Sequence, residues 1–136
     1  MILVDTSVLI DYFKGINNIS ARAFDEILEN GIPYGINEFI YQEILQGSRT
    51  VEEFQKLKEY LETIHFYSLK YGKESFEKAA YLNFICKRAE VTIRSTIDLL
   101  IAEIAIENEL FLLHNDKDFN YMSKVVPELK IYELRK

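Results

Sequence analysis

Carboxylates recur in this 136-residue chain where a folded protein seldom places an acid without a purpose. Asp5 directly follows the apolar run 2–4. Asp116 and Asp118 follow a second apolar run, 110–113. If both runs are parallel strands, these acids lie at the carboxyl ends of the strands, where open α/β folds bind ligands. For Asp5 taken alone, capping the helix that follows is an equally good interpretation.

Two further acids fall on the apolar faces of predicted helices. Glu43 lies on the apolar stripe of segment 38–46, where the sequence offers no neighbouring base to pair with it. Because burying an unpaired carboxylate costs several kcal/mol, Glu43 should have a partner. Asp98 heads the inward face of segment 95–108, although Ser95 and Asp98 also fit a capping box.

Taken together, these acids predict a divalent-cation site. Two carboxylates about 4 Å apart repel by about 1 kcal/mol in water and by more inside a protein, so a cluster stays ionised only beside a cation. Oxygen ligands without Cys or His nearby favour Mg²⁺ or Mn²⁺ over Zn²⁺. Such a site leaves coordination positions for water and for a substrate phosphate, which is what metal-assisted phosphodiester hydrolysis requires.

The elements that must position these acids alternate between short apolar runs and segments of helical periodicity. The predicted strands are 2–4, 32–36, 64–69, 110–113 and 131–132. The predicted helices are 8–13, 21–29, 38–46, 50–62, 73–90 and 95–108. Gly15, Gly31 and Gly47 follow the first three helices, at a position that commonly requires positive φ. The alternation predicts an α/β fold, a three-layer α/β/α sandwich around a small, mostly parallel sheet.

Composition narrows the class of protein. No repeat or linker divides the chain, so we expect a single domain over residues 1–136. A lone Cys86 and the absence of a basic leader or a long apolar run predict a cytoplasmic protein without a membrane partner. The net charge of −6 argues at first against RNA. Bases outnumber acids only in residues 49–94, by nine to seven, and this middle segment could present a basic face.

Four motifs in register resemble the PIN domain, specifically the VapC-type toxins of bacterial and archaeal toxin–antitoxin pairs. The matching segments are 2–10, 43–47, 98–102 and 115–119. They follow the order and spacing usual for the family across the whole chain. The resemblance implies a PIN-like fold, endoribonuclease activity with Mg²⁺ (Mn²⁺ may substitute), a homodimer, and a cognate antitoxin whose tail covers the active site.

The resemblance also implies roles for the acids. Asp5 and Asp98 map onto the family's most regular metal-binding acids, and Glu43 maps onto the supporting acid. Family members carry the fourth acid at the position of Asp116, of Asp118, or at both. Both therefore stay catalytic candidates, with Asp116 also assigned as a metal ligand.

Several other polar residues are candidates for supporting roles. Ser7 could donate to a metal-bound water or phosphate as an outer partner of the site, with helix capping as the competing interpretation. Lys87, Arg88 and Arg94 precede the last predicted helix and could hold the RNA backbone, although a solvated helix end explains them equally simply. His114 departs from the family pattern, which often has Thr before the fourth acid.

The sequence thus predicts a toxin that hydrolyses RNA phosphodiester bonds by metal-activated water. The alternative is a catalytically silent PIN-like module that binds a protein partner or RNA through its acidic site. A phosphorelay receiver is disfavoured because Asp5 stands alone after its strand and no acid follows the central run 64–69. A phosphatase with two acids spaced by one residue is excluded because Ser7 occupies the second position. The RNA target, the number of metal ions and the dimer geometry stay open.

Overall fold

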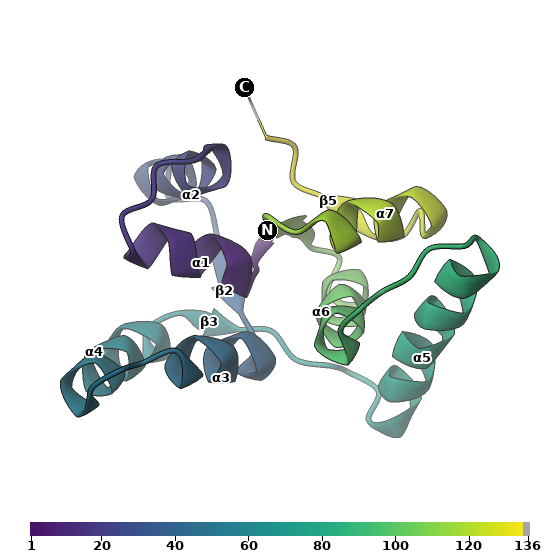
Figure 1. The fold of residues 1–136 in the computed structure, drawn as a ribbon, viewed down its shortest axis with the longest axis horizontal. Coiled ribbons are helices and arrows are strands. Elements are labelled where there is room, and N and C mark those ends of the chain that lie inside the picture. Colours follow the sequence, from purple (N-terminus) through teal and green to yellow (C-terminus); the bar gives the residue numbers. More distant parts are fainter. Residues whose placement is uncertain (135–136) are drawn as a thin grey trace.

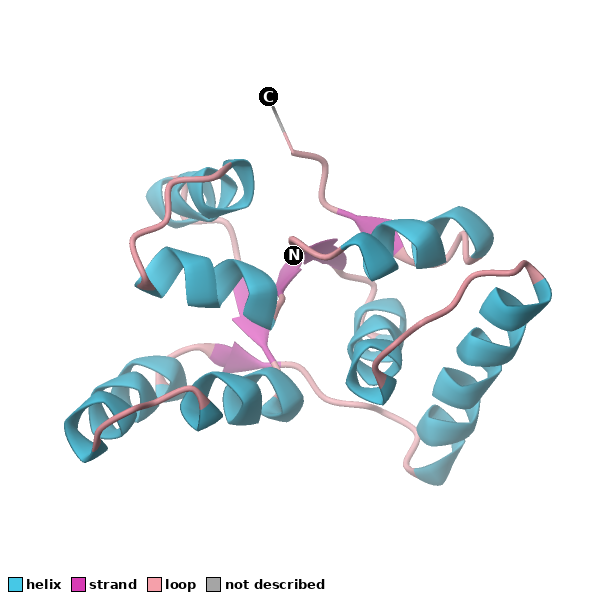
Figure 2. Cartoon of the chain, viewed as in Figure 1, coloured by secondary structure: helices cyan, strands magenta, loops and turns pink. Residues whose placement is uncertain are grey.

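A computed structural model describes residues 1–134, in which a five-stranded sheet is packed between helices (Figures 1 and 2). The strands are β1 (Ile2–Val4), β2 (Tyr34–Ile36), β3 (His65–Phe66), β4 (Phe111–Leu113) and β5 (Lys130–Ile131). The helices are α1 (Thr6–Phe13), α2 (Ile19–Glu29), α3 (Glu38–Gln46), α4 (Val51–Glu62), α5 (Lys73–Arg88), α6 (Thr96–Glu107) and α7 (Lys117–Val125). No helix in this described part of the chain is long and apolar enough to cross a membrane.

All strand pairs are parallel, and the spatial order is β3-β2-β1-β4-β5. Helices α1 to α4 connect β1, β2 and β3 on one side of the sheet, and α5 to α7 lie on the other side (Figure 1). This arrangement confirms the predicted three-layer α/β/α sandwich. The chain moves outward from β1 in one direction and then resumes at β4 on the opposite side, and open parallel sheets commonly bind ligands at the carboxyl ends of the strands where the order reverses in this way.

The central strand β1 determines where Asp5, the residue that follows it, lies in the fold. All three of its residues are buried, and Val4 pairs in register with Leu113 of β4. The Asp5 backbone N–H extends this ladder by donating to the Leu113 carbonyl at 2.9 Å. Helix α6 backs the sheet with an almost wholly buried middle, from Leu99 to Ala105. The ends of β1 and β4 are therefore fixed side by side by packing on both faces.

Helix α7 is absent from the sequence prediction, which assigns no helix or strand between residues 113 and 131. The helix spans nine residues and buries Asp118, Phe119 and Met122. So short an amphipathic pattern, next to acids already assigned to chemistry, gives little periodic signal. The helix matters for the site because it begins directly at Asp116.

The prediction of positive φ holds for Gly15 (73°) and Gly31 (62°) but is wrong for Gly47, whose φ is −78°. Helix α3 ends in a tightened turn, in which the Gly47 and Ser48 N–H groups donate to carbonyls three residues back. That ending needs no left-handed residue. The left-handed residues after α5 and α6 are instead Glu90 and Glu109.

Helix α6 also buries a carboxyl that the sequence analysis did not single out. Glu103 is 3% exposed, and Glu107 follows one turn later. The Oε1 atom of Glu107 accepts hydrogen bonds from the Lys70 N–H (2.7 Å) and the Ser75 hydroxyl (3.1 Å). Its Oε2 atom is buried, and none of the residues 1–134 supplies it with a standing donor. A protonated Glu103 can provide that donor.

The pKa values of the two groups support this arrangement. Burial, with added effects of the Glu107 carboxylate, raises the pKa of Glu103 to about 8. Burial also opposes ionisation of Glu107, but hydrogen bonds from Glu103, the Lys70 N–H and Ser75 lower its pKa overall. Glu103 is therefore the protonated member of the pair, and the pair ties α6 to the start of α5.

We expect the free energy of unfolding to fall as the pH rises from 4.5, the ordinary pKa of Glu103, to about 8, its pKa in the folded protein. In that range the folded protein keeps a proton that the unfolded chain has lost. Glu103→Gln keeps a donor that cannot ionise and should remove this part of the pH dependence. Glu103→Ala leaves the Glu107 oxygen unpaired and should cost about 1–3 kcal/mol.

Urea unfolding over a pH series measures both effects, with the exposed Glu77→Gln on α5 as the matched control. Parallel pH profiles of the unsubstituted chain and Glu103→Gln would contradict the assignment.

Candidate functional site

Asp5 lies at the carboxyl end of β1 and is 5% exposed. It caps α1: its Oδ2 atom accepts from the Ser7 N–H (3.1 Å) and from the Ser7 hydroxyl (2.7 Å). Both Ser7 contacts use the same oxygen, so the second oxygen takes no part in them. Burial raises the pKa of Asp5 to about 6, although the Ser7 hydrogen bonds work in the opposite direction. The helix cap is confirmed, and it leaves Asp5 an oxygen for another ligand.

Ser7 links the two loops at this edge of the sheet. Its hydroxyl donates to Asp5 and accepts from the Asn115 N–H at 2.9 Å. The Asn115 side chain adds a second connection, because its Nδ2 donates to Asp11 of α1 at 3.3 Å. The hydroxyl proton that the sequence analysis reserves for a bound water or phosphate is thus given to Asp5. Ser7 remains a direct partner of a candidate metal ligand.

Glu43 reaches the same edge from α3. It is half-buried, and its Oε1 atom accepts a hydrogen bond from the Thr6 hydroxyl at 3.0 Å. Thr6 is the residue next to Asp5, so this bond brings the Glu43 carboxylate toward the end of β1. The expected partner of Glu43 is therefore a hydroxyl group and not a base.

Asp98 is the third residue of α6 and is half-buried. The helix begins after Ser95, but the Ser95 side chain makes no capping hydrogen bond. The Ser95 side chain therefore does not form the hydrogen bond that the capping-box interpretation predicts for it. Helix geometry alone does not account for the carboxylate at this position.

Five carboxylates form a group that we call the acidic edge, because four of them act electrostatically on the fifth, Asp98. Its members are Asp5, Glu43, Asp98, Asp116 and Asp118. Burial raises the pKa of Asp98 to about 7, and the four other carboxylates add to the rise. In decreasing order of effect they are Asp5, Asp116, Glu43 and Asp118. Four separate parts of the chain therefore bring acids within electrostatic reach of one another.

The donor chemistry of the acidic edge fits a hard cation. Its ligands are carboxylate oxygens, which suit Mg²⁺ or Mn²⁺, and the lone Cys86 is buried elsewhere on α5. Within residues 1–134, no three His, Cys, Asp or Glu side chains are close enough together to hold one ion as they stand.

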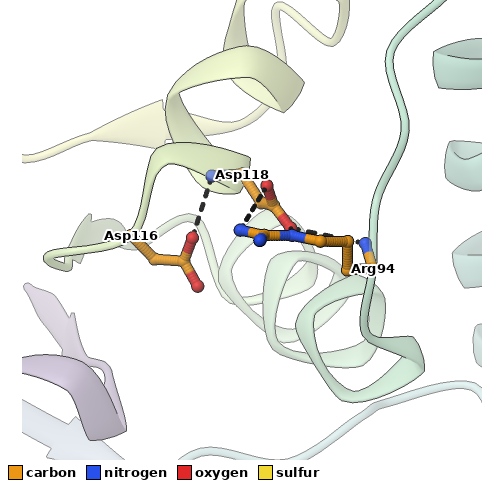
Figure 3. Close-up of polar contacts among 3 residues, drawn as sticks. All are labelled: Arg94, Asp116 and Asp118. Carbon is orange, nitrogen blue, oxygen red and sulfur yellow. Dashed lines mark hydrogen bonds and ion pairs between the residues drawn. The ribbon is translucent and has the colours of Figure 1, made fainter.

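Asp116 and Asp118 are two residues apart but have different partners (Figure 3). Asp116 caps α7, with its Oδ1 accepting from the Asp118 N–H at 2.9 Å, and its second oxygen points away from Arg94. Asp118 is 4% exposed and meets Arg94 in three contacts of 3.3 Å. The backbone N–H and Nε donate to Oδ2, and Nη2 donates to Oδ1.

The three bases proposed to hold RNA are not brought together. Lys87 and Arg88 are exposed at the end of α5, and the Arg88 guanidinium lies 5.8 Å from the centre of the Phe84 ring. Arg94 alone of the three lines a hollow of about 660 Å³ that also includes Asp116. The structure thus separates Arg94 from the other two candidates.

His114 supports the loop that carries Asp116. It is 6% exposed, and its Nδ1 atom accepts from the Asp116 N–H at 3.0 Å. Burial lowers the pKa of His114, which keeps the ring neutral and able to accept. Sequence reasoning missed this role and that of Thr6. The position of Thr6 beside Asp5 was the available signal for the latter.

Comparison with known proteins gives consistent matches. The family model of the PIN domain matches residues 2–125. Ribonuclease VapC11 from Mycobacterium tuberculosis is 29% identical over 126 residues, which cover 92% of this chain and 93% of that protein. The structure of VapBC2 from Rickettsia felis bound to a promoter DNA fragment matches with a TM-score of 0.75 and 18% identity, covering 99% of this chain and 100% of that chain. VapBC-1 from nontypeable Haemophilus influenzae matches with a TM-score of 0.69 and 20% identity, covering 98% of each chain.

Because Asp98 is held among like charges, we expect Asp98→Asn to stabilise the protein in the presence of a chelator at neutral pH. Each pKa unit of elevation corresponds to about 1.4 kcal/mol, and allowing for the partial exposure of Asp98 we expect a gain of about 1–2 kcal/mol. The raised pKa means that the gain appears above the ordinary pKa of 3.8 and is complete once the pH exceeds about 7.

Thermal unfolding with EDTA at several pH values measures the gain, and the exposed Glu59→Gln on α4 is the control. A destabilised Asp98→Asn protein at pH above 7 would show that the carboxylate stabilises the fold.

Proposed function

This chain belongs to the PIN-domain family, and on that premise we propose that it is an endoribonuclease, the toxin of a toxin–antitoxin pair, that uses Mg²⁺ or Mn²⁺. The observation that carries the proposal is the acidic edge, where burial and the carboxylates of three other parts of the chain raise the pKa of Asp98 to about 7. Such a concentration of acids costs stability unless a cation neutralises it. The relative named Ribonuclease VapC11 supports RNA as the substrate class.

Asp5, Asp98 and Asp116 would hold the ion, and Glu43 would complete the site. When bound, a divalent ion supplies an activated water and stabilises the charge that develops on the scissile phosphate. The protein's own part is orientation. Ser7 fixes Asp5 through two contacts to one oxygen, and the Thr6 hydroxyl, which is next in sequence to Asp5, fixes Glu43.

The loop that carries Asp116 is positioned from two sides. The Asn115 N–H donates to the Ser7 hydroxyl, and the Asp116 N–H donates to His114. Because both donors are backbone groups, the Asp116 side chain is placed by main-chain geometry and keeps an oxygen outside its capping bond. Positioned ligands of this kind reduce the reorganisation needed during the reaction.

The proposal extends to partners. A cognate antitoxin is supported by the fold match to toxin–antitoxin complexes, including VapBC2 and VapBC-1. A homodimer is supported by large apolar side chains exposed on α5. These are Phe76, Tyr81 and Phe84, each at least half exposed. We place the activity in the cytoplasm, where RNA and the antitoxin would meet the protein.

We expect Asp5→Asn and Asp98→Asn each to lower the rate of RNA cleavage on the order of 100-fold or more, because each removes a charged ligand from the reacting centre. EDTA should abolish cleavage by the unsubstituted protein, and Mg²⁺ or Mn²⁺ should restore it. Cleavage of a labelled single-stranded RNA measures the rates, and Glu59→Gln serves as the matched control with an exposed acid on α4.

Circular dichroism establishes that each variant is folded before its rate is compared. Asp98→Asn cleaving RNA as fast as the unsubstituted protein in Mg²⁺ would refute the assignment. If the unsubstituted protein binds the ion but cleaves no RNA, the catalytically silent module is the correct alternative.

A further inference from the structure

The contact between Arg94 and Asp118 gives these two residues roles that differ from those of the other acids. We infer that Asp118 is not a metal ligand but a positioning residue, which holds Arg94 at the hollow beside Asp116 so that Arg94 binds a phosphate of the RNA strand. The inference rests on the proposed function and deepens it. It identifies Arg94 as the side chain that binds an RNA phosphate, and Asp118 as the buried acid that positions Arg94.

Asp118 is already fully engaged. Both of its oxygens accept hydrogen bonds from the Arg94 side chain, and one also accepts from the Arg94 backbone N–H. Asp118 is 4% exposed, so recruiting it to an ion would take a buried carboxylate away from its partner Arg94. Separating a buried charge from its partner is unfavourable, because the charge stays buried. Asp116, in contrast, keeps one oxygen directed away from this pair (Figure 3).

Arg94 is engaged on one side only. Its side chain is 74% exposed although its partner is buried. A guanidinium carries five N–H donors, and Asp118 takes two of them, those on Nε and Nη2. The remaining donors can bind a phosphate oxygen. Since the ion pair already restricts the side chain, less conformational entropy is lost when the phosphate binds.

Arg94 and the proposed metal ligand Asp116 line the same hollow. The hollow of about 660 Å³ is lined by Thr92, Arg94, Asn115, Asp116, Lys117 and Tyr121, among others. Hydrogen bonding and charge from Asp118 raise the pKa of Arg94, and the Asp116 and Asp98 carboxylates add to this. Arg94 is therefore within electrostatic reach of two proposed metal ligands. A strand with its scissile phosphate at the acidic edge would place a neighbouring phosphate in this hollow.

Two other roles for the contact make different predictions. If Asp118 is a metal ligand, its loss weakens ion binding. If the contact only anchors the segment before α6, its loss changes stability but not the use of RNA. A substitution that removes both charges separates these cases without leaving an unpaired buried charge. Arg94→Gln/Asp118→Asn meets this requirement and leaves the net charge at −6.

The first measurement is Mn²⁺ affinity by titration calorimetry on purified protein without RNA. We expect the double variant to bind Mn²⁺ within about twofold of the unsubstituted protein, because distant compensated charges contribute little. Asp116→Asn, the matched comparison on the same loop, should weaken binding by about tenfold or more. A double variant that loses as much Mn²⁺ affinity as Asp116→Asn would overturn the inference.

The second measurement is steady-state cleavage of a fluorophore–quencher RNA that contains all four bases. Losing a charge-assisted contact to phosphate should raise KM about tenfold in Arg94→Gln, while kcat changes by less than about twofold. Adding Asp118→Asn to Arg94→Gln should raise KM no further, because Asp118 acts through Arg94. Arg94→Lys should recover only part of the loss, since a lysine cannot form the two-pronged contact.

Unfolding midpoints establish that the variants are folded, and if Asp118→Asn alone unfolds, Arg94→Gln and the double variant still carry the test. An unchanged KM in both would show a purely structural contact and overturn the inference. Failure of the unsubstituted protein to cleave any RNA would overturn the proposed function instead. In either case the Mn²⁺ titration tests whether Asp118 is a metal ligand.

Discussion

Repulsion among desolvated carboxylates is the constraint that the rest of this structure accommodates. The fold places acids from the end of β1, from α3, from α6 and from the β4–α7 loop near one edge of the sheet, and three of them are restrained by a nearby donor. Asp5 is held by Ser7, Glu43 by Thr6, and Asp116 by the first turn of α7. The buried strand β1 and the buried middle of α6 supply the packing that opposes the repulsion.

The protein neutralises two of its buried acids, in two physically different ways, and leaves the others charged. Glu103 keeps its proton, because burial beside Glu107 makes ionisation unfavourable. Asp118 is paired with Arg94. The remaining acids have only hydroxyl and backbone donors, which orient a carboxylate but do not cancel its charge. The net charge of −6 hides these differences, because the same formal charge of −1 is counted for a protonated acid, for an acid paired with an arginine and for an acid without a basic partner.

Local patterns predicted most of what positions the acidic edge. The apolar run before Asp5, the stripe that includes Glu43 and the inward face that begins at Asp98 can each be recognised within one helix or strand. The pairing of Arg94 with Asp118 spans 24 residues and depends on how the segment before α6 crosses α7. The hydrophobic periodicity of a sequence does not predict which distant segments lie against each other in the fold. Helix α7 was missed because its first residues, Lys117 to Phe119, belong to the acid motif that had already been assigned to chemistry.

The hydrogen bonds through Ser7 have a fixed direction. The Asn115 N–H can only donate, so the Ser7 oxygen must accept from it and direct its own proton to Asp5. The donor at one end of these two hydrogen bonds is the main chain of Asn115, and the acceptor at the other end is the titratable Oδ2 atom of Asp5. A proton placed on that oxygen would leave two donors facing each other. The seating of the β4–α7 loop therefore favours an Asp5 with no proton on Oδ2, and a proton taken up by Asp5 goes to its other oxygen.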